Sequence, residues 1–493
     1  MSSSLRIAVI GGGFSGIAAA VQVEKQLGLK ATIFEACHDF GGTWMVNTYW
    51  GCGCDVPSHL YSLSFEKNPN WSERYSKQPE IYDYMKGVAK KYKLYDQAHL
   101  NTEVIEANWK EENKEWELKV HHKETGETRI VYFDVVFAGL GPLRIPNIPE
   151  EFKNFEGPLV HTAFWDKSID YTNKKVGMIG SGASAVQVIP QLQPIVSSLT
   201  SYQRSPTWCI ARKQYYYSSF TKSLFNWFPF LMLIHRFFIF ITNEIFFYLG
   251  FRYHNSYLGK KVHASFKKQM KQRLIDNGRP DLVDKLTPDY EAGCRRITPS
   301  ETYLESLCKE NIMVERSRIE SVKGRTIRTV DGNETEFDIL ILATGYNTTG
   351  FLGNLQVNGR DSVNLNKLWE ENYTDTYKTI AIHGFPNFFM LLGPGSGLGH
   401  NSVVTMAEIQ VNNAIKCIRQ LKDGVKAIEP TEKAQAKFVK ELKDGLSKTV
   451  WTTGCESWYK NKNGEVFALY AGSVTSFWWK LRNNNFDTDF IKY

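Results

Sequence analysis

Residues 11–16 of this chain read GGGFSG and follow an apolar run, residues 5–10, that is typical of a buried strand. The stretch after them is rich in small residues and predicts a helix. In such a turn Gly11 permits a tight bend, Gly13 lets the backbone approach a pyrophosphate, and Gly16 allows the helix to pack on the strand. Because the positive end of the helix then faces the phosphates, the spacing predicts a dinucleotide site.

An acidic residue supports this interpretation. The next expected strand, residues 31–34, ends at Glu35, which stands 24 positions after Gly11. A carboxylate at that position can accept hydrogen bonds from a ribose diol. The alternative is a purely structural turn, which the strand, helix and acid together make the weaker interpretation.

Residues 180–185, GSGASA, repeat the pattern after an expected strand at 176–179, with alanine as the last residue. Here the residue 24 positions after Gly180 is Arg204, at the end of the expected strand 199–203. An arginine there can pair with a 2′-phosphate, which favours NADPH over NADH. The alternative is an ordinary surface arginine at a strand end. Two nucleotide sites in one chain imply a relay in which the nicotinamide reduces a flavin at the first site.

Two further motifs carry a family resemblance. Residues 155–166 read FEGPLVHTAFWD, and residues 41–51 read GGTWMVNTYWG with an aspartate four positions later. The first closely resembles the Baeyer–Villiger monooxygenase fingerprint, FxGxxxHxxxW followed by Pro or Asp. The second resembles that family's GGxWxxxxYPGxxxD, with Trp50 in place of proline. The resemblance covers nearly the whole chain, although His161 and Trp165 alone would more often be a linker histidine and a core aromatic.

The resemblance implies that Gly42, Thr43 and Trp44 line FAD. It places Asp55 near the flavin, where it orients a catalytic arginine; the alternative is an acid of a surface loop. It also assigns cofactor contacts to residues near both nucleotide turns, namely Phe14, Ser15, Tyr61, Val104, Trp165, Ser181, Gly182, Ala183, Ser184 and Ser205.

Residues 291–299, EAGCRRITP, resemble the family's Cys-Lys-Arg segment with arginine in place of lysine. By this match Arg296 is the active-site arginine that stabilises a negatively charged flavin C4a-peroxide, and Arg295 helps Arg204 hold the 2′-phosphate of NADP. Such a peroxide persists only where a fixed cation stabilises it and water is kept out. Without the surrounding motifs, a double arginine would be solvated surface charge.

The activity that the resemblance implies is an FAD- and NADPH-dependent insertion of one oxygen atom from O2 next to a ketone carbonyl, giving an ester or lactone. The first alternative is N- or S-oxidation, because the related flavin monooxygenases share much of the fingerprint but typically lack its Trp-Asp ending. The second is a disulfide reductase using Cys52 and Cys54, although a Cys-Gly-Cys disulfide closes a strained ring. A sensing or scaffolding role would need a broken nucleotide turn, and both turns are intact.

Two later segments bring the chain back toward the flavin. Residues 337–346 are a buried-strand pattern that ends in Ala-Thr-Gly, whereas the counterpart at 133–141 lacks Ala-Thr and turns at Gly141. Residues 393–402, GPGSGLGHNS, resemble the family's loop against the flavin and open a helix at Val403. The alternative for this loop is a plain glycine-rich turn.

The elements that position these residues are predicted to form an α/β protein with two intertwined Rossmann-like domains. We expect residues 1–145 and 346–493 in the FAD domain, residues 146–212 and 290–345 in the NADP domain, and residues 213–289 in a helical insertion.

Aromatic residues dominate the insertion, above all residues 227–234 and 237–241. Charged and polar residues interrupt it, so no stretch of about 18 uncharged residues predicts a transmembrane helix. The plain interpretation is a helical subdomain whose apolar face packs on the NADP domain. The functional interpretation is a roof over a pocket for an apolar ketone, with peripheral membrane contact through residues 224–251.

Composition excludes several other classes of protein. The chain has 493 residues, eight cysteines and a net charge of +7, without a Lys/Arg block that would predict a nucleic-acid surface. We expect a cytoplasmic protein with mostly free thiols, because no secretory signal opens the sequence. No metal centre is expected, since only Cys52-Gly-Cys54 has a spacing near that of metal ligands. The oligomeric state is not defined by the sequence.

Overall fold

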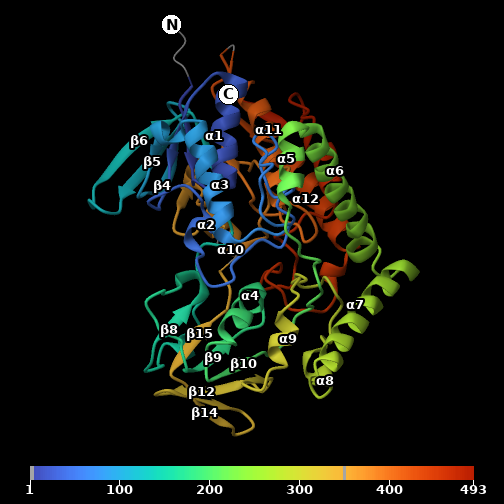
Figure 1. Cartoon of the computed structure of the whole chain (residues 1–493). Helices are drawn as coiled ribbons and strands as arrows, with labels where there is room; N and C mark the ends of the chain where they lie inside the picture. Colours follow the sequence, from blue (N-terminus) through green and yellow to red (C-terminus); the bar gives the residue numbers. More distant parts are fainter. Residues whose placement is uncertain (1–4, 348–350, 423) are drawn as a thin grey trace.

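Two five-stranded parallel sheets form the centres of two α/β units in the computed structural model (Figure 1), which describes residues 5–347, 351–422 and 424–493. The start of the chain, on which the expectation of no secretory signal rests, lies partly outside these ranges. The first sheet has the order β17-β7-β1-β2-β3. Its strands are β1 (Ile7–Ile10), β2 (Ala31–Phe34), β3 (Ala98–His99), β7 (Val135–Ala138) and β17 (Phe388–Met390).

The central strands β1 and β7 are buried along their whole length, as parallel strands are when other elements cover both faces. Helix α1 (Phe14–Leu27) follows β1 and packs against α11 (Val403–Ile418) from the far end of the chain. Helix α1 ends at Gly28, whose φ of 69° is in the left-handed region that terminates helices. The first sheet is therefore completed by segments that are distant in sequence, as an intertwined architecture requires.

The second sheet has the order β11-β10-β9-β15-β8 and is also parallel throughout. Its strands are β8 (Leu159–His161), β9 (Lys175–Ile179), β10 (Ser198–Tyr202), β11 (Ile312–Glu315) and β15 (Ile339–Leu342). Helix α4 (Ala183–Leu192) follows β9, and α9 (Tyr303–Leu307) packs beside it. The expected α/β fold with two Rossmann-like units is confirmed; β2 has the expected ends, and β1, β9 and β10 differ from the expected strands by one or two residues at their ends.

Smaller elements complete the two units. The strands β4 (Thr102–Lys110), β5 (Glu115–His122) and β6 (Thr128–Phe133) form an antiparallel sheet, which β16 (Gln356–Asn358) joins in parallel beside β4. A second antiparallel sheet consists of β12 (Ile319–Lys323), β13 (Thr326–Thr329) and β14 (Glu334–Glu336), and β18 (Ile428–Pro430) pairs antiparallel with the distant β19 (Phe490–Lys492). The further α-helices are α2 (Thr43–Val46), α3 (Gln78–Lys91), α10 (Leu365–Glu371), α12 (Glu432–Leu446) and α13 (Val474–Leu481).

The insertion is helical, as predicted, and runs along the right side of Figure 1. It consists of α5 (Ser219–Trp227), α6 (Pro229–Phe246), a π-helix η4 (Phe247–Arg252), α7 (Tyr257–Asp276) and α8 (Leu282–Leu286). The expectation that it packs on the NADP unit is wrong for its first half. Buried residues of α5, α6 and η4 share the core of the first sheet, whereas those of α7 and α8 share the core of the second. The insertion therefore bridges the two units.

A disulfide joins Cys294 to Cys455 across 161 residues of sequence, while the other six cysteines are free thiols. The expectation of mostly free thiols holds for those six. The bridge itself was not predicted, because no local spacing pairs two cysteines so far apart. It links the segment that carries the double arginine to the C-terminal part of the chain.

Candidate active site

The first glycine-rich turn, residues 11–16, packs closely against the neighbouring backbone. Gly11 has a φ of 102°, and a Cβ there would lie 2.5 Å from the carbonyl oxygen of Gly139. A Cβ on Gly16 would lie 1.8 Å from the Gly11 carbonyl oxygen. Glu35 is buried, and its carboxylate accepts hydrogen bonds from the backbone N–H groups of Gly12 (2.5 Å) and Cys37 (2.8 Å). The acid at the end of β2 thus lies directly beside the turn.

Bare backbone and an uncapped helix end give this turn the form that a pyrophosphate requires. Gly13 is the N-cap of α1 and offers no side chain to its N–H groups. Gly42 lies opposite, so close that its Cβ would be 2.9 Å from the Cα of Gly13. Free N–H groups at a helix N-terminus, lined by glycine, fit the phosphates of FAD.

Several residues expected to contact FAD lie together beside this turn. The indole N–H of Trp44 donates to the Tyr61 hydroxyl at 3.1 Å. The rings of Phe14 and Tyr61 meet edge to face, with centroids 5.2 Å apart. Thr43 begins α2, whereas Val104 lies in β4 and belongs to a buried core. The structure brings Phe14, Trp44 and Tyr61 into one cluster, and their contacts with the cofactor stay predictions.

The second turn repeats the first in its backbone. Gly180 has a φ of 109°, and its Cβ would lie 2.5 Å from the Ala343 carbonyl oxygen. Gly182, the uncapped N-cap of α4, has no atom within 4 Å of its Cβ position among the described residues. Ser181 donates to the Ser205 carbonyl oxygen at 2.7 Å, and Ala183 and Ser184 open α4. This open, uncapped helix end fits the pyrophosphate of a second dinucleotide.

Arg204 and Arg295 converge on one segment near the C-terminus. The Arg204 guanidinium, whose side chain is 76% exposed, lies 3.0 Å from the Glu456 carboxylate. The Nε atom of Arg295 donates to the Glu456 carbonyl oxygen at 2.5 Å, and its guanidinium lies over the ring of Tyr290. Two accessible cations within reach of each other fit a 2′-phosphate.

Arg296 and Asp55 form a two-point ion pair. Nε and Nη2 of Arg296 donate to the two carboxylate oxygens of Asp55 at 2.7 and 2.6 Å. Burial alone would raise the pKa of Asp55, but the charge and hydrogen bonds of Arg296 outweigh it and hold that pKa below its ordinary value. Burial would likewise lower the pKa of Arg296, and Asp55 raises it instead. The pair therefore stays charged, with the plane of the guanidinium fixed.

The loop that carries Asp55 rests on the second unit. Tyr49 donates from its hydroxyl to the Gln187 side chain at 2.8 Å, and that side chain donates to the Gly53 carbonyl oxygen at 2.9 Å. A Cβ on Gly51 would lie 2.3 Å from the Gln187 carbonyl oxygen, so only glycine fits there. These contacts join the first unit to helix α4 and position Asp55 at the boundary between the two units.

Trp50, the residue that replaces the family's proline, fills a space beside the fingerprint. Its ring lies 5.8 Å from that of Trp165 and 5.3 Å from that of Tyr171, and Trp165 stacks on Tyr171. The Nδ1 atom of His161 accepts a hydrogen bond from Ala163 and caps the short turn that ends at Trp165. His161 and Trp165 are both buried, and here they shape the connection between the two units.

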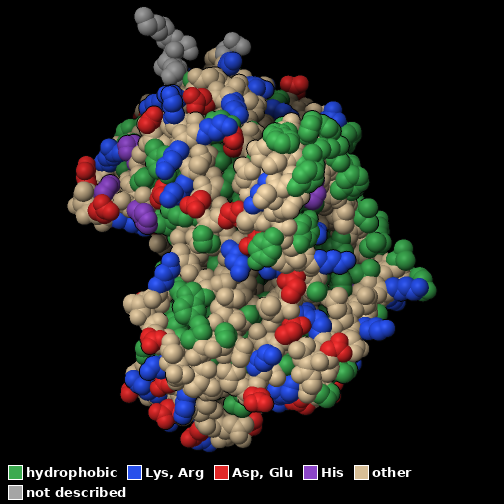
Figure 2. All heavy atoms as spheres, in the orientation of Figure 1, with side chains coloured by type: hydrophobic (Ala, Val, Ile, Leu, Met, Phe, Trp, Pro, Cys, Tyr) green, Lys and Arg blue, Asp and Glu red, His purple; other side chains and the backbone are tan. Residues whose placement is uncertain are grey.

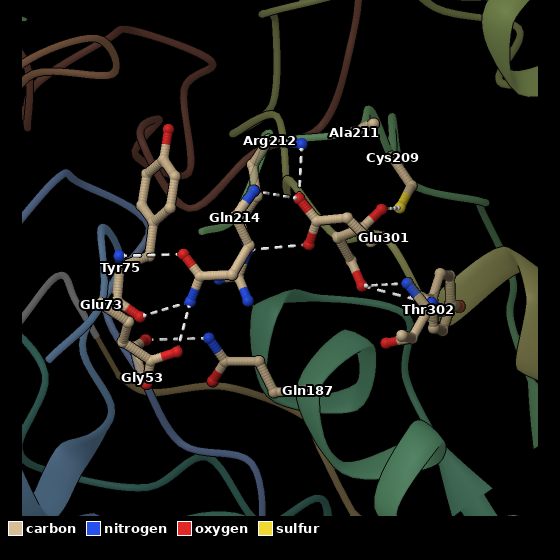
Figure 3. Close-up of polar contacts among 12 residues, drawn as sticks. Gly53, Glu73, Tyr75, Gln187, Cys209, Ala211, Arg212, Gln214, Glu301 and Thr302 are labelled. Atoms are coloured by element: carbon tan, nitrogen blue, oxygen red, sulfur yellow. Dashed lines mark hydrogen bonds and ion pairs between the residues drawn. The ribbon is translucent and has the colours of Figure 1, made fainter. Parts of the chain in front are cut away.

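A network of polar side chains beyond Asp55 was not predicted from the sequence (Figure 3). The Gln214 side chain donates to the Glu73 carboxylate at 2.6 Å and accepts from the Tyr75 N–H at 3.1 Å. Glu301 accepts from the backbone and the side chain of Arg212, each at 3.0 Å. The Arg212 charge also contributes to the low pKa of Asp55. The segment that leads into the insertion is thus tied to both units.

The glycine-rich loop at residues 393–402 reaches Arg296. The Leu398 carbonyl oxygen accepts from Nη1 of Arg296 at 3.5 Å. His400 is buried, and its ring centroid lies 4.5 Å from that of Phe247 in the π-helix. Phe251, from the same π-helix, packs against the segment 291–299 that carries Arg296, since a Cβ on Gly293 would lie 2.7 Å from the Phe251 ring. The site therefore combines both units and the insertion.

A family model for flavin-binding monooxygenase-like proteins matches residues 4–441. The chain belongs to this family. A "Baeyer-Villiger monooxygenase" of Streptomyces coelicolor is 35% identical over 96% of this chain and 90% of its own length. Another protein of that name, from Pseudomonas aeruginosa, is 34% identical over 97% of this chain and 89% of its own length.

Solved structures agree with these relatives. The "OTEMO complex with FAD and NADP" is 26% identical, has a TM-score of 0.86 and covers all of both chains. "Oxidized steroid monooxygenase bound to NADP" is 26% identical with a TM-score of 0.85 over 99% of both chains. The expectation of an FAD- and NADPH-dependent Baeyer–Villiger monooxygenase is confirmed in family, fold and cofactors.

The cysteines required by the reductase alternative are in the wrong environment in this monooxygenase. Cys52 and Cys54 are buried free thiols. Burial raises the pKa of Cys52 to about 12 and also raises that of Cys54. Since the thiolate is the reactive form, these groups are poorly suited to disulfide exchange.

No role was expected for Tyr459 or Cys294 beside the ion pair, although both lie in segments that resemble the family. Tyr459 is buried, and the Arg296 and Asp55 charges both act on its hydroxyl. Cys294 precedes the double arginine and is bonded to Cys455, which precedes Glu456. The disulfide thus fixes the arginine segment to the segment that contacts Arg204 and Arg295.

Proposed function

We propose that this monooxygenase inserts an oxygen atom beside the carbonyl of an apolar ketone, with Arg296 as the cation at the reacting oxygen and Asp55 as the residue that positions it. The observation that carries the proposal is the two-point ion pair, with contacts of 2.6 and 2.7 Å, beside the loop at residues 393–402. It lies where the two nucleotide units and the insertion meet.

The chain's own part in the reaction is electrostatic. Bound FAD, once reduced by NADPH, supplies the activated oxygen. Arg296 keeps its charge because Asp55 raises its pKa, and its orientation is set by two hydrogen bonds before the reaction begins. A cation fixed in advance stabilises an anionic oxygen and a tetrahedral adduct of the carbonyl without reorganising during the step. Partial burial of the pair keeps bulk water from screening it.

Cofactor binding is assigned to both turns. In this proposal the FAD pyrophosphate lies against Gly11, Gly13 and Gly16, with Glu35 on the ribose. The NADP pyrophosphate lies at the start of α4, and its 2′-phosphate takes the place of the Glu456 contacts on Arg204 and Arg295. A phosphate carries more charge than a single carboxylate, so it can displace that exposed pair.

The insertion supports an apolar substrate, with O2 as the second reactant. Phe247 packs against His400, and Phe251 packs against Gly293 in the segment 291–299 that carries Arg296. Large aromatic side chains at the site favour an apolar ketone over a charged one. The proposal includes a cytoplasmic location, peripheral membrane contact through residues 224–251, and the domain boundaries expected from the sequence.

The test is product identification with purified enzyme, NADPH and O2 across a panel of apolar ketones and sulfides. We expect esters or lactones from ketones, formed in proportion to NADPH consumed. Sulfoxides or N-oxides alone, with every ketone recovered unchanged, would move the protein to the N- or S-oxidising alternative.

A further inference from the structure

The charged residues of the helical segment 229–252 all point into the protein. Arg236 donates to the carbonyl oxygens of His59 and Ser62 and to the Ser62 hydroxyl at 2.6 to 3.0 Å. Arg252 donates to the Gly445 carbonyl oxygen at 2.9 Å. Glu244 is also buried. This arrangement is the reverse of an ordinary surface helix, which turns its charges to water.

The outward side of the same segment, continued by Trp227 at the end of α5, is apolar apart from the exposed Thr242. Its positions recur with helical spacing from one end to the other: Trp227, Phe230, Leu233, Ile234, Phe237, Phe238, Ile241, Ile245 and Tyr248. Phe237 and Phe238, near the middle, are 59% and 61% exposed. Figure 2 shows these hydrophobic side chains gathered along the edge that α5 and α6 form. At about 1.5 Å per residue the stripe is roughly 30 Å long.

Helix α13 extends this stripe with two tryptophans. Glu244 accepts hydrogen bonds from the N–H groups of Val474 and Thr475 at 3.0 and 2.9 Å, so α6 caps the first turn of α13. Trp478 and Trp479 of α13 are 47% and 66% exposed. A groove of about 380 Å³ lies between the π-helix and α13, lined by Tyr248, Tyr470, Thr475, Ser476, Trp479 and Lys480. The stripe, Trp478 and Trp479 form one continuous area, called here the docking surface.

Basic side chains border the docking surface at the end nearer α13. The Arg482 guanidinium lies over the rings of Trp478 and Trp479. Lys480 lines the groove and pairs with the exposed Glu441, which offsets part of its charge, so Arg482 contributes more to this border. After the π-helix in the chain, the beginning of α7 carries the exposed Lys260 and Lys261. Within the described residues the outward positions of the stripe hold no acid, so the area is apolar with a positive border.

We infer that the docking surface binds the surface of an anionic lipid bilayer, with α6 lying in the plane of the membrane. The inference rests on the membrane contact proposed for residues 224–251 and adds α13, the orientation and the lipid charge. An apolar helix face inserts among the acyl chains, tryptophans favour the headgroup level, and lysine and arginine attract anionic headgroups.

These contacts do not fit a helix that spans the bilayer. Among the described residues, α6 and the π-helix together (residues 229–252) form the one helix long and apolar enough to span it, and only 22% of its apolar stretch is buried. Arg236 near the middle and Glu244 and Arg252 farther along are bonded to the rest of the protein. Pulling the helix across a bilayer would leave these charges without partners in hydrocarbon. The helix can therefore lie on a membrane while the protein stays folded.

The test is flotation of the full-length FAD-loaded enzyme with vesicles of phosphatidylcholine alone and of phosphatidylcholine with phosphatidylglycerol. We expect binding to the anionic vesicles that is several-fold stronger than to the neutral ones and weakens with salt. Phe237→Glu/Phe238→Glu should reduce binding by roughly ten-fold or more, because it places two charges in the apolar stripe. Arg482→Ala/Lys480→Ala should reduce mainly the preference for anionic lipid.

The matched control is Ile130→Glu/Val330→Glu, which alters two exposed apolar side chains on other parts of the molecule and should bind vesicles like the wild type. Turnover of a water-soluble ketone without vesicles separates this inference from the proposed reaction, since Phe237 and Phe238 lie outside the site. Recovery of the wild type away from both kinds of vesicle would overturn the inference. So would a dimer by light scattering that Phe237→Glu/Phe238→Glu converts to monomer without any vesicle binding, because the occupant would then be a second copy of the chain.

Discussion

The two nucleotide turns share a backbone and differ in the charged residue at the end of the next strand. Gly11 and Gly180 have φ values of 102° and 109°, and each would place a Cβ 2.5 Å from a carbonyl oxygen. After the first turn, Glu35 is buried with both carboxylate oxygens bonded to backbone N–H groups. After the second, Arg204 is exposed and held by an equally exposed Glu456. In the proposed function, this difference suits the first site to a cofactor that stays bound and the second to a cofactor that enters and leaves.

The same substitution in each turn should separate the two cofactors. Gly11→Ala forces a side chain against Gly139 at a left-handed φ, so we expect the purified protein to lose FAD and all activity. Gly180→Ala meets the same obstacle at Ala343 but should retain FAD and lose reduction by NADPH. Visible flavin absorbance and anaerobic NADPH titration distinguish the two. Full retention of FAD by Gly11→Ala would mean that the turn does not hold it.

Arg204→Glu tests whether the exposed arginine recognises the 2′-phosphate of NADPH. We expect KM for NADPH to rise by about 100-fold, with a much smaller change for NADH, because a cation–phosphate contact becomes a repulsion. Initial rates with both cofactors give the comparison, and Arg325→Glu at another exposed site is the control. Equal changes for NADPH and NADH would remove Arg204 from the phosphate site.

Asp55→Asn tests how far the orientation of the Arg296 guanidinium depends on the charge of Asp55. We expect kcat to fall by about ten-fold while NADPH binding is retained, because the guanidinium loses its fixed orientation. The folded-state pKa of Asp55 lies below 3.8, so the ion pair stabilises the wild type fully above that pH and is lost only as the pH falls through the lower value. The free energy of unfolding and the rate of ester formation, each measured against pH, should therefore follow different profiles in the wild type and in Asp55→Asn. Superimposable profiles would contradict this role.

Glu456→Gln should have the smallest effect. Removing the carboxylate that occupies Arg204 should tighten NADP binding by about two- to five-fold, in line with the small free energy of an exposed ion pair. Fluorescence titration of the oxidised enzyme with NADP measures it, and Glu441→Gln is a matched exposed control. Weaker binding in Glu456→Gln would show that Glu456 supports the cofactor rather than competing with it.

Local patterns in the sequence predicted most of the fold. Strand β2 was predicted with its exact ends, and α11 begins at Val403 as expected, because apolar runs and glycine turns act within a few residues. The pairing of Asp55 with Arg296 came only through the family resemblance, since 241 residues separate them and no local rule connects them. The disulfide between Cys294 and Cys455 was missed for the same reason.

The insertion was misplaced for a different physical reason. A segment that is apolar on nearly every side does not reveal which side is buried. The charges of Arg236 and Glu244 would ordinarily mark the side that faces water, whereas here they bind backbone groups of the first unit and of α13. Only the contacts in the folded structure show that these charged residues face the protein and that the apolar residues face outward.

The most direct test of the central claim is the yield of ester per NADPH consumed in Arg296→Ala, with Arg295→Ala as the neighbouring control. If Arg296 is the fixed cation at the reacting oxygen, its variant should retain FAD and be reduced by NADPH while ester formation falls by about 10²–10³-fold. Arg295→Ala should weaken NADPH binding and leave the ester yield per NADPH unchanged. A wild-type ester yield in Arg296→Ala would contradict the account.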